Sequence, residues 1–229
     1  MKGRHLESRA RRRRMGVATV LTLSLSALPL AAHAGIFRDL LSDVGIVKDP
    51  QPPKAGTAAA QTLPRQGFAC CVLHYKKDTI EDSNYASLPL IPAGTPIEVI
   101  NYGRHRAYIK IENKNMLLMQ EESHDQEPLD SWVGKMVVST DPRPHMATYP
   151  KPVQEAIRIG KVMVGMTREQ TIAAVGYPLA SENVTLDAPT WRVWRAHGEE
   201  YDLNFGSDGR LKSVTGDDSV TGQVIYQPG

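Results

Sequence analysis

The sequence predicts an α+β protein in which a small N-terminal β-barrel is followed by a two-layer helix-helix-strand-strand-strand module. Between residues 68 and 138, several short apolar or alternating runs are separated by turns, which is typical of small barrels. Between residues 152 and 178 lie two short helical patterns with marked ends, and three strand patterns follow between residues 191 and 214. Two short helices can cover one apolar face of a three-stranded meander and so form a two-layer unit.

Residues 1–34 have the pattern of a secretory signal peptide. A cluster of Lys and Arg is followed by an almost wholly apolar run from Met15 to Leu30, and Ala32-His33-Ala34 then offers a cleavage site. These three features define signal peptides. The alternative is a retained membrane anchor, but the apolar run is shorter than the roughly 18–20 residues that a spanning helix needs. We therefore expect cleavage and export to the periplasm.

Removal of this leader reverses the sign of the net charge. The leader holds seven Lys and Arg residues and one Glu, so its loss changes the net charge from +2 to −4. A nucleic-acid-binding domain needs a basic face, and the mature composition predicts none. The residue after Ala34 is Gly35 rather than a cysteine that could carry a lipid. We expect a periplasmic protein, free or associated with the outer membrane, without a transmembrane segment, a lipid anchor or a nucleic-acid partner.

The mature chain divides by composition. Residues 35–66 include the Pro-, Ala- and Gly-rich run "KDPQPPKAGTAAAQTLPRQ", which predicts a flexible linker. A β domain is expected over residues 67–149. The run "STDPRPHMATYPKP" contains four prolines, so we expect neither a helix nor a central strand to pass through it. This places a boundary near Pro150, with a second domain over 150–217 and a C-terminal tail over 218–229.

The β domain is expected to contain five strand segments. Pro92-Ala93-Gly94 predicts a turn before a strand over residues 96–102, and "ENKN" predicts a hairpin turn into "MLLMQ". The alternation of "RAYIKI" places Ala107, Ile109 and Ile111 on one face. "FACCVLHY" and "WVGKMVV" are interpreted as further strands. The stretch from His74 to Tyr102 resembles a bacterial SH3-like domain.

Both helices of the second domain carry terminal signals. Pro152 suits a first helical position, after which Val153, Ala156 and Ile157 form an apolar stripe that ends at Gly160. In "GMTREQTIAAVGYP", residues 165–178, Thr167 and Gln170 predict a capping box. Gly176 marks the end of this helix. Strands are expected over residues 191–196, 201–205 and 210–214, with the sequence "SDG" as the turn between the last two.

This second domain resembles the SmpA/OmlA family, whose member BamE is a small component of outer-membrane protein assembly. The resemblance covers about residues 159–214 and rests on a helix start, a helix end, a strand tryptophan and a final hairpin. The matching residues are Gly165, Met166, Thr167, Gln170, Gly176, Pro178, Trp191, Phe205, Asp208 and Gly209. The resemblance implies a BamE-like periplasmic binding module rather than an enzyme.

The outer face of the three-stranded sheet is the first candidate binding surface. Strand alternation places Trp191 on the helix side and Trp194 on the opposite side. An outward tryptophan beside arginines is a suitable anchor for a protein partner. The alternative is that Trp194 packs against the SH3-like domain or the tail. The candidate partner-binding residues are Arg192, Trp194, Asp202, Asn204 and Lys212.

A second candidate is an aromatic peptide groove in the β domain. SH3-like domains bind peptides through aromatic side chains, and bacterial versions bind cell-wall peptides. The alternative is that half of these tyrosines belong to the core, because tyrosine also suits strands. The candidate residues are Tyr75, Tyr85, Tyr102 and Tyr108.

Cys70 and Cys71 are the only cysteines. They can be a reduced pair, form an intermolecular bridge, or form a strained vicinal disulfide with a redox role. No further Cys or His stands at the spacing of a zinc site, and neither a metalloprotease nor a serine-hydrolase motif is present. We expect no cofactor, no metal and no catalysis.

The sequence thus predicts a non-enzymatic protein-binding module of the bacterial cell envelope, linked to outer-membrane protein assembly. Two alternatives remain at this point. In the first, the SH3-like domain binds peptidoglycan peptides. In the second, Cys70 and Cys71 carry a thiol redox function.

Overall fold

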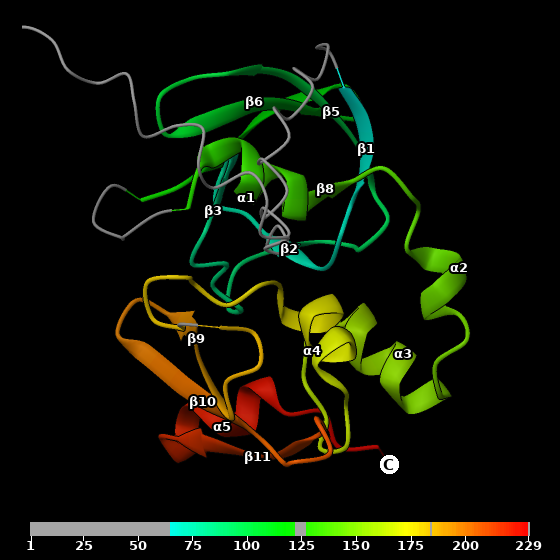
Figure 1. Cartoon of the computed structure of the whole chain (residues 1–229), viewed down its shortest axis with the longest axis vertical. Helices are drawn as coiled ribbons and strands as arrows, with labels where there is room; N and C mark the ends of the chain where they lie inside the picture. Colours follow the sequence, from blue (N-terminus) through cyan, green and yellow to red (C-terminus); the bar gives the residue numbers. More distant parts are fainter. Residues whose placement is uncertain (1–64, 122–126, 184, 229) are drawn as a thin grey trace, which may run out of the picture. The chain divides into compact units, whose positions relative to one another are not determined.

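The computed structural model describes residues 65–121, 127–183 and 185–228 (Figure 1). The predicted signal peptide and almost all of the predicted linker lie outside these residues. All described elements belong to one compact unit, residues 55–229. They include helices and β-sheets, which confirms the α+β class.

The first part of the described chain is built on a curled six-stranded sheet with the order β3-β7-β6-β5-β1-β8. The pairing of β3 with β7 is parallel, and the other neighbours are antiparallel. Two further short strands, β2 (Leu73–His74) and β4 (Leu90–Ile91), pair with each other. The strands of the large sheet are β1 (Arg65–Ala69), β3 (Thr79–Glu81), β5 (Pro96–Tyr102), β6 (Arg106–Ile111), β7 (Lys114–Met119) and β8 (Val137–Val138).

The alternation predicted for residues 106–111 is confirmed. Ala107, Ile109 and Ile111 of β6 are buried on one face of the sheet. The turn before β5 is also confirmed, because the Thr95 hydroxyl donates to the Pro92 carbonyl oxygen at 2.7 Å. Gly94 there has φ +79°, a backbone conformation that glycine adopts readily.

The strand predicted for "WVGKMVV" is wrong over most of its length. Residues Leu129–Met136 form helix α1, and only Val137–Val138 form a strand. Strand alternation would place Trp132 and Val133 on opposite faces, whereas both are buried in the same core as Met136. A helix brings these positions onto one side, so burial of the large side chains decides in favour of the helix.

Two other predictions about the first part need correction. The "FACCVLHY" segment is not one strand, because β1 ends at Ala69 and β2 begins at Leu73, with the two cysteines between them. The proline-rich run contains a short helix, α2 (Arg143–Met146). Pro142 is its N-cap and Pro144 lies in its first turn, where the missing N–H groups cost no helical hydrogen bond.

The second part has the predicted order of two helices and three strands. The sheet order is β11-β10-β9, with β10 in the centre. Trp191, Val193, Tyr201, Leu203 and Phe205 are buried against the helices, which confirms the predicted facing. The elements are α3 (Lys151–Arg158), α4 (Arg168–Val175), β9 (Thr190–Ala196), β10 (Glu199–Phe205) and β11 (Leu211–Gly216).

Helix α4 begins with the predicted capping box. The Thr167 hydroxyl oxygen accepts from the Gln170 backbone N–H at 3.2 Å, and the Thr167 N–H donates to Gln170 Oε1 at 3.0 Å. Gly176 ends the helix with φ +83°. The helix buries Ala173, Ala174 and Val175 and also the polar residues Gln170 and Thr171.

We expect Thr167→Ala to lower the free energy of unfolding by about 1 kcal/mol through loss of the cap. Thr167→Ser retains the hydroxyl and should remain close to the wild type. Urea denaturation of both variants measures the difference. Equal losses in the two variants would show that the methyl group, not the cap, carries the effect.

The predicted C-terminal tail contains a helix. Residues Asp218–Val224 form α5, and the Asp217 carboxylate caps it by accepting from the Ser219 N–H at 2.8 Å. Val220 and Val224 are buried in the core of the second part. After the helix, the Tyr226 N–H donates to the Val162 carbonyl oxygen at 2.7 Å. These contacts fix the segment against the link between α3 and α4.

The two parts are joined by hydrogen bonds at the end of α4. The Val72 N–H donates to the Ala173 carbonyl oxygen at 3.0 Å. Asn84 Nδ2 donates to the carbonyl oxygens of Val175 at 2.8 Å and Val72 at 3.1 Å, while its Oδ1 accepts from the His74 N–H at 2.6 Å. Carbonyls of the last helical turn have no partner within their helix, so the first part supplies those partners.

Candidate functional site

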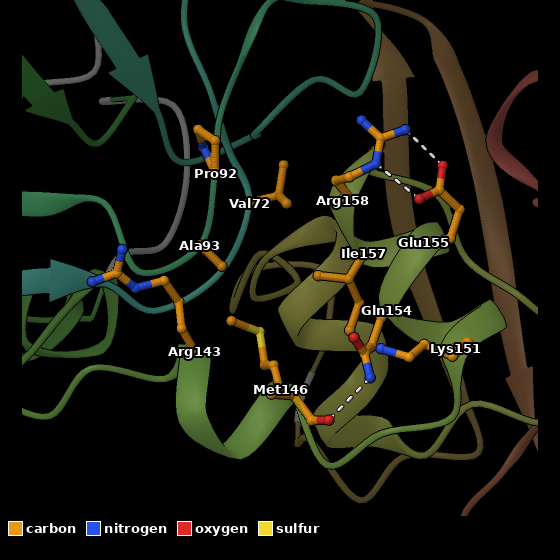
Figure 2. Close-up of a pocket in the computed structure, with 11 residues that line it drawn as sticks. Val72, Pro92, Ala93, Arg143, Met146, Lys151, Gln154, Glu155, Ile157 and Arg158 are labelled. Atoms are coloured by element: carbon orange, nitrogen blue, oxygen red, sulfur yellow. Dashed lines mark hydrogen bonds and ion pairs between the residues drawn. The ribbon is translucent and has the colours of Figure 1, made fainter.

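A groove with an apolar lining lies where helices α2 and α3 meet the turn before β5 (Figure 2). Its cavity measures about 400 Å³, at the small end of the range for ligand sites. The lining consists of Val72, Pro92, Ala93, Arg143, Met146, Ala147, Lys151, Gln154, Glu155, Ile157 and Arg158.

The apolar residues of this groove are held by the surrounding core. Val72 is 1% exposed and packs among the buried residues of the second part. Ile157 belongs to the same core through the buried stripe of α3, and Met146 of α2 packs against it. Gln154 Nε2 donates to the carbonyl oxygens of Ala147 at 3.0 Å and of Tyr149 at 2.7 Å. These bonds fix the connection between α2 and α3.

The rim of the groove is positively charged. Arg143, Lys151 and Arg158 oppose the single carboxylate of Glu155 within the lining, which sums to +2. Asp141 pairs with Arg143 from outside the lining and reduces the local charge to +1. Hydrogen bonds from Arg158 lower the pKa of Glu155, and hydrogen bonds from Arg143 lower the pKa of neighbouring Asp141. Both carboxylates therefore stay ionised under ordinary conditions.

Lys151 stands in a position that helix stability does not favour. It is the first residue of α3, whose first turn contains no acidic residue. The positive end of the helix dipole disfavours a cation there. Lys151 also forms no ion pair with any residue that the structure describes. Lys151 is exposed, so its ammonium group is available to a ligand at the edge of the groove.

His74 is buried next to Asn84, the residue that joins the two parts. Burial lowers the pKa of His74 to about 4, and the hydrogen bond to Asn84 opposes this shift only in part. The side chain is 2% exposed, and Nδ1 makes no hydrogen bond to a described residue. Because the buried imidazole is uncharged, the free energy of unfolding of the protein depends on pH.

Between pH 6.5 and pH 4 the unfolded chain binds a proton at His74 that the folded chain does not. Stability therefore falls as the pH falls through this window. We expect a loss of about 2 kcal/mol in the free energy of unfolding between pH 7 and pH 5. Urea titrations at both pH values measure this loss. In His74→Gln the stability should change less steeply with pH, and the loss between pH 7 and pH 5 should be smaller by about that amount. An unchanged slope in the variant would contradict the assignment to His74.

The predicted partner-binding residues lie on the outer side of the sheet, but they largely interact with their own chain. Arg192 forms an ion pair with Asp202 at 3.1 Å, and Lys212 one with Asp208 at 2.8 Å. Asn204 bonds to the hydroxyls of Thr190 and Thr215 on the neighbouring strands.

Trp194 on the same face is half-buried, and its carbonyl oxygen accepts from the Ala86 N–H at 3.3 Å. The strand that carries this tryptophan is therefore in contact with the first part. The role of the outer face in partner binding stays a prediction.

The four candidate tyrosines do not line one groove. Tyr75 and Tyr102 are partly buried against the core of the first part, and burial raises the pKa of Tyr85. Tyr108 is 45% exposed and lines a separate cavity of about 560 Å³ beside Ile100, which is 41% exposed. That cavity is lined by none of the other three tyrosines.

Cys70 and Cys71 are joined in a vicinal disulfide. Of the three states left open by the sequence, the structure therefore has the vicinal disulfide. Its redox role stays a prediction. Cys71 is buried, whereas Cys70 is partly buried and lines a cavity of about 390 Å³ together with His145 and Tyr177. The disulfide separates β1 from β2 and directly precedes Val72.

Within the described ranges, no group of three or more His, Cys, Asp or Glu residues is arranged to hold a metal ion. No helix there combines the length and apolar character needed to cross a bilayer. Comparisons with protein-family models, with curated proteins and with solved structures find no match to the chain.

Sequence reasoning missed the groove entirely. Its lining comes from four separate segments, represented by Val72, Pro92, Met146 and Ile157. The available signal was local: Lys151, near the end of the proline-rich run, starts α3, where an acidic residue is the usual choice.

Proposed function

We propose that this protein is an exported, non-enzymatic binding protein of the bacterial cell envelope and that the groove of Figure 2 contacts its protein partner. The observation that carries the proposal is an apolar groove with a net positive charge at its rim. Apolar surface with a few charged groups at its edge is typical of binding sites. Export is supported by the leader in residues 1–34.

We also propose a finer description of the two parts. Residues 150–217 form a BamE-like module, supported by the element order α3-α4-β9-β10-β11 and by the Thr167–Gln170 capping box. Residues 67–149 form an SH3-like domain, supported by the curled sheet of short strands. The BamE-like module connects the protein to outer-membrane protein assembly, so a component of that machinery is the first partner to test.

Site-specific photocrosslinking in intact envelopes tests this function. A photoreactive phenylalanine analogue replaces Ala147, an exposed residue of the groove, and adducts are identified by mass spectrometry. The matched control carries the analogue at Ser213, which is exposed on β11. We expect adducts with one envelope protein from Ala147 only. Adducts from Ser213 alone would move the contact to the outer sheet face, and adducts from neither position would refute the proposal.

The exposed pair Ile100 and Tyr108 favours a second candidate function. These side chains flank their own cavity on the large sheet, and exposed aromatic residues can bind peptides. We propose peptidoglycan peptides as the alternative ligand. Sedimentation with purified cell walls should be reduced by Tyr108→Ala. Equal sedimentation of the variant would exclude this surface.

A further inference from the structure

We infer that the groove of Figure 2 binds an extended protein segment that carries both apolar side chains and carboxylates. This inference rests on the proposed function and specifies the partner for the same site. It follows from three features of the groove: an apolar floor, unused guanidinium donors and a rim whose charge opposes that of the whole protein.

The floor is suited to apolar side chains of a bound segment. Val72, Ala93, Met146 and Ile157 present carbon and sulfur atoms to the cavity (Figure 2). A cavity of about 400 Å³ accommodates a few side chains rather than a folded surface. Burial of such side chains drives association, so the apolar part of the segment supplies affinity.

The two arginines of the rim keep donors available for a ligand. Arg143 uses Nε and Nη2 on Asp141, and Arg158 uses Nε and Nη2 on Glu155. Among the described contacts, Nη1 of each guanidinium therefore remains for a further acceptor. Because their own carboxylates already orient the planar groups, a second carboxylate can bind without first ordering the side chain.

The positions of these groups fit an extended segment. Figure 2 shows Arg143 and Arg158 on opposite sides of the apolar residues, with Lys151 near the start of α3. A chain that crosses the floor can therefore place carboxylates at both ends of its apolar stretch. Planar guanidinium groups match carboxylate geometry.

The charge of the whole protein makes this preference selective. The mature chain carries −4 by its composition, whereas the groove lining together with the paired Asp141 carries +1. A basic segment would be attracted to other surfaces and repelled at the rim. An acidic segment is instead attracted to the rim and repelled by the other surfaces. Such complementary potentials select the partner.

Fluorescence anisotropy with labelled peptides tests the inference on the purified exported protein. The first peptide is a nonapeptide that combines leucines with three aspartates. In the second peptide lysines replace the aspartates, and in the third serines replace the leucines. We expect the first to bind about tenfold more tightly than either of the others, with an affinity that falls as salt is added.

Charge reversal at Lys151 supplies the specific control. Lys151→Glu should weaken binding of the aspartate peptide about tenfold and strengthen binding of the lysine peptide. Lys76→Glu makes the same charge change at an exposed lysine outside the groove and should change neither affinity by more than about twofold. Circular dichroism confirms that both variants fold.

Several outcomes would overturn the inference. They are equal binding of the acidic and basic peptides, equal binding of the serine peptide, no peptide binding at all, or equal effects of the two lysine variants. If the peptides fail while Ala147 still crosslinks to an envelope protein, the proposed function stands and the acidic, apolar segment is wrong. If both experiments fail, the groove is not a binding site.

Discussion

Replacement of Asn84 with alanine is expected to lower the free energy of unfolding by about 3 kcal/mol, because three hydrogen bonds of roughly 1 kcal/mol each are lost. The side chain of this residue bonds to Val72, Val175 and the backbone N–H of His74. Its backbone has φ +45°, a conformation that asparagine tolerates better than alanine. Urea denaturation followed by circular dichroism measures the loss.

Asn84→Asp separates the donor role from the acceptor role. The aspartate retains an acceptor for the His74 N–H, but it turns a negative oxygen toward the carbonyls of Val72 and Val175. We expect the variant to be at least as unstable as Asn84→Ala at pH 7. A stability close to that of the wild type would show that the two donated bonds contribute little.

The second large effect is expected at Trp191, whose replacement with alanine should cost about 3–5 kcal/mol. The indole is fully buried, packs against Phe205 with ring centroids 4.6 Å apart, and donates from Nε1 to the Leu186 carbonyl oxygen at 3.2 Å. Its removal leaves a cavity in the core of the second part. The shift of the denaturation midpoint measures the cost.

Trp194→Ala is the matched control for this prediction. It removes the same side chain from the same strand, but from the other face, where the tryptophan is only half-buried. We expect less than half the loss seen for Trp191→Ala. If Trp194→Ala is as damaging, the outer face is part of the core and cannot be a binding surface.

Much of the second part could be predicted because its signals are local. The Thr167–Gln170 capping box and the φ > 0 glycine at 176 each depend on a few neighbouring residues. The alternation of β9 and β10 also predicted which side of the sheet Trp191 faces. Local patterns of this kind act within one element, so one sequence is enough to read them.

The sequence could not predict features that depend on distant contacts. The positions of Trp132 and Val133 fit both a strand and a helix pattern. Only their packing in the core of the first part makes α1 a helix. Similarly, no local pattern indicates that Asn84 closes the end of a helix 91 positions later. The groove is a further case, because Val72 and Ile157 come together only where the two parts are in contact. The candidate tyrosines failed for the same reason, because their residue type says nothing about their relative position.

The loop after Asn84 also protects an edge of the smaller sheet. The N–H groups of Ala86 and Ser87 donate to the carbonyl oxygens of Trp194 and Arg195, so this stretch of β9 cannot pair with a strand from another molecule. Exposed edges of this kind promote aggregation. A fragment cut at Pro150 would keep all six elements from α3 to α5 and yet uncover this stretch of β9. The first part thus prevents self-association through this stretch of β9. We expect expression of the second part alone to yield aggregates.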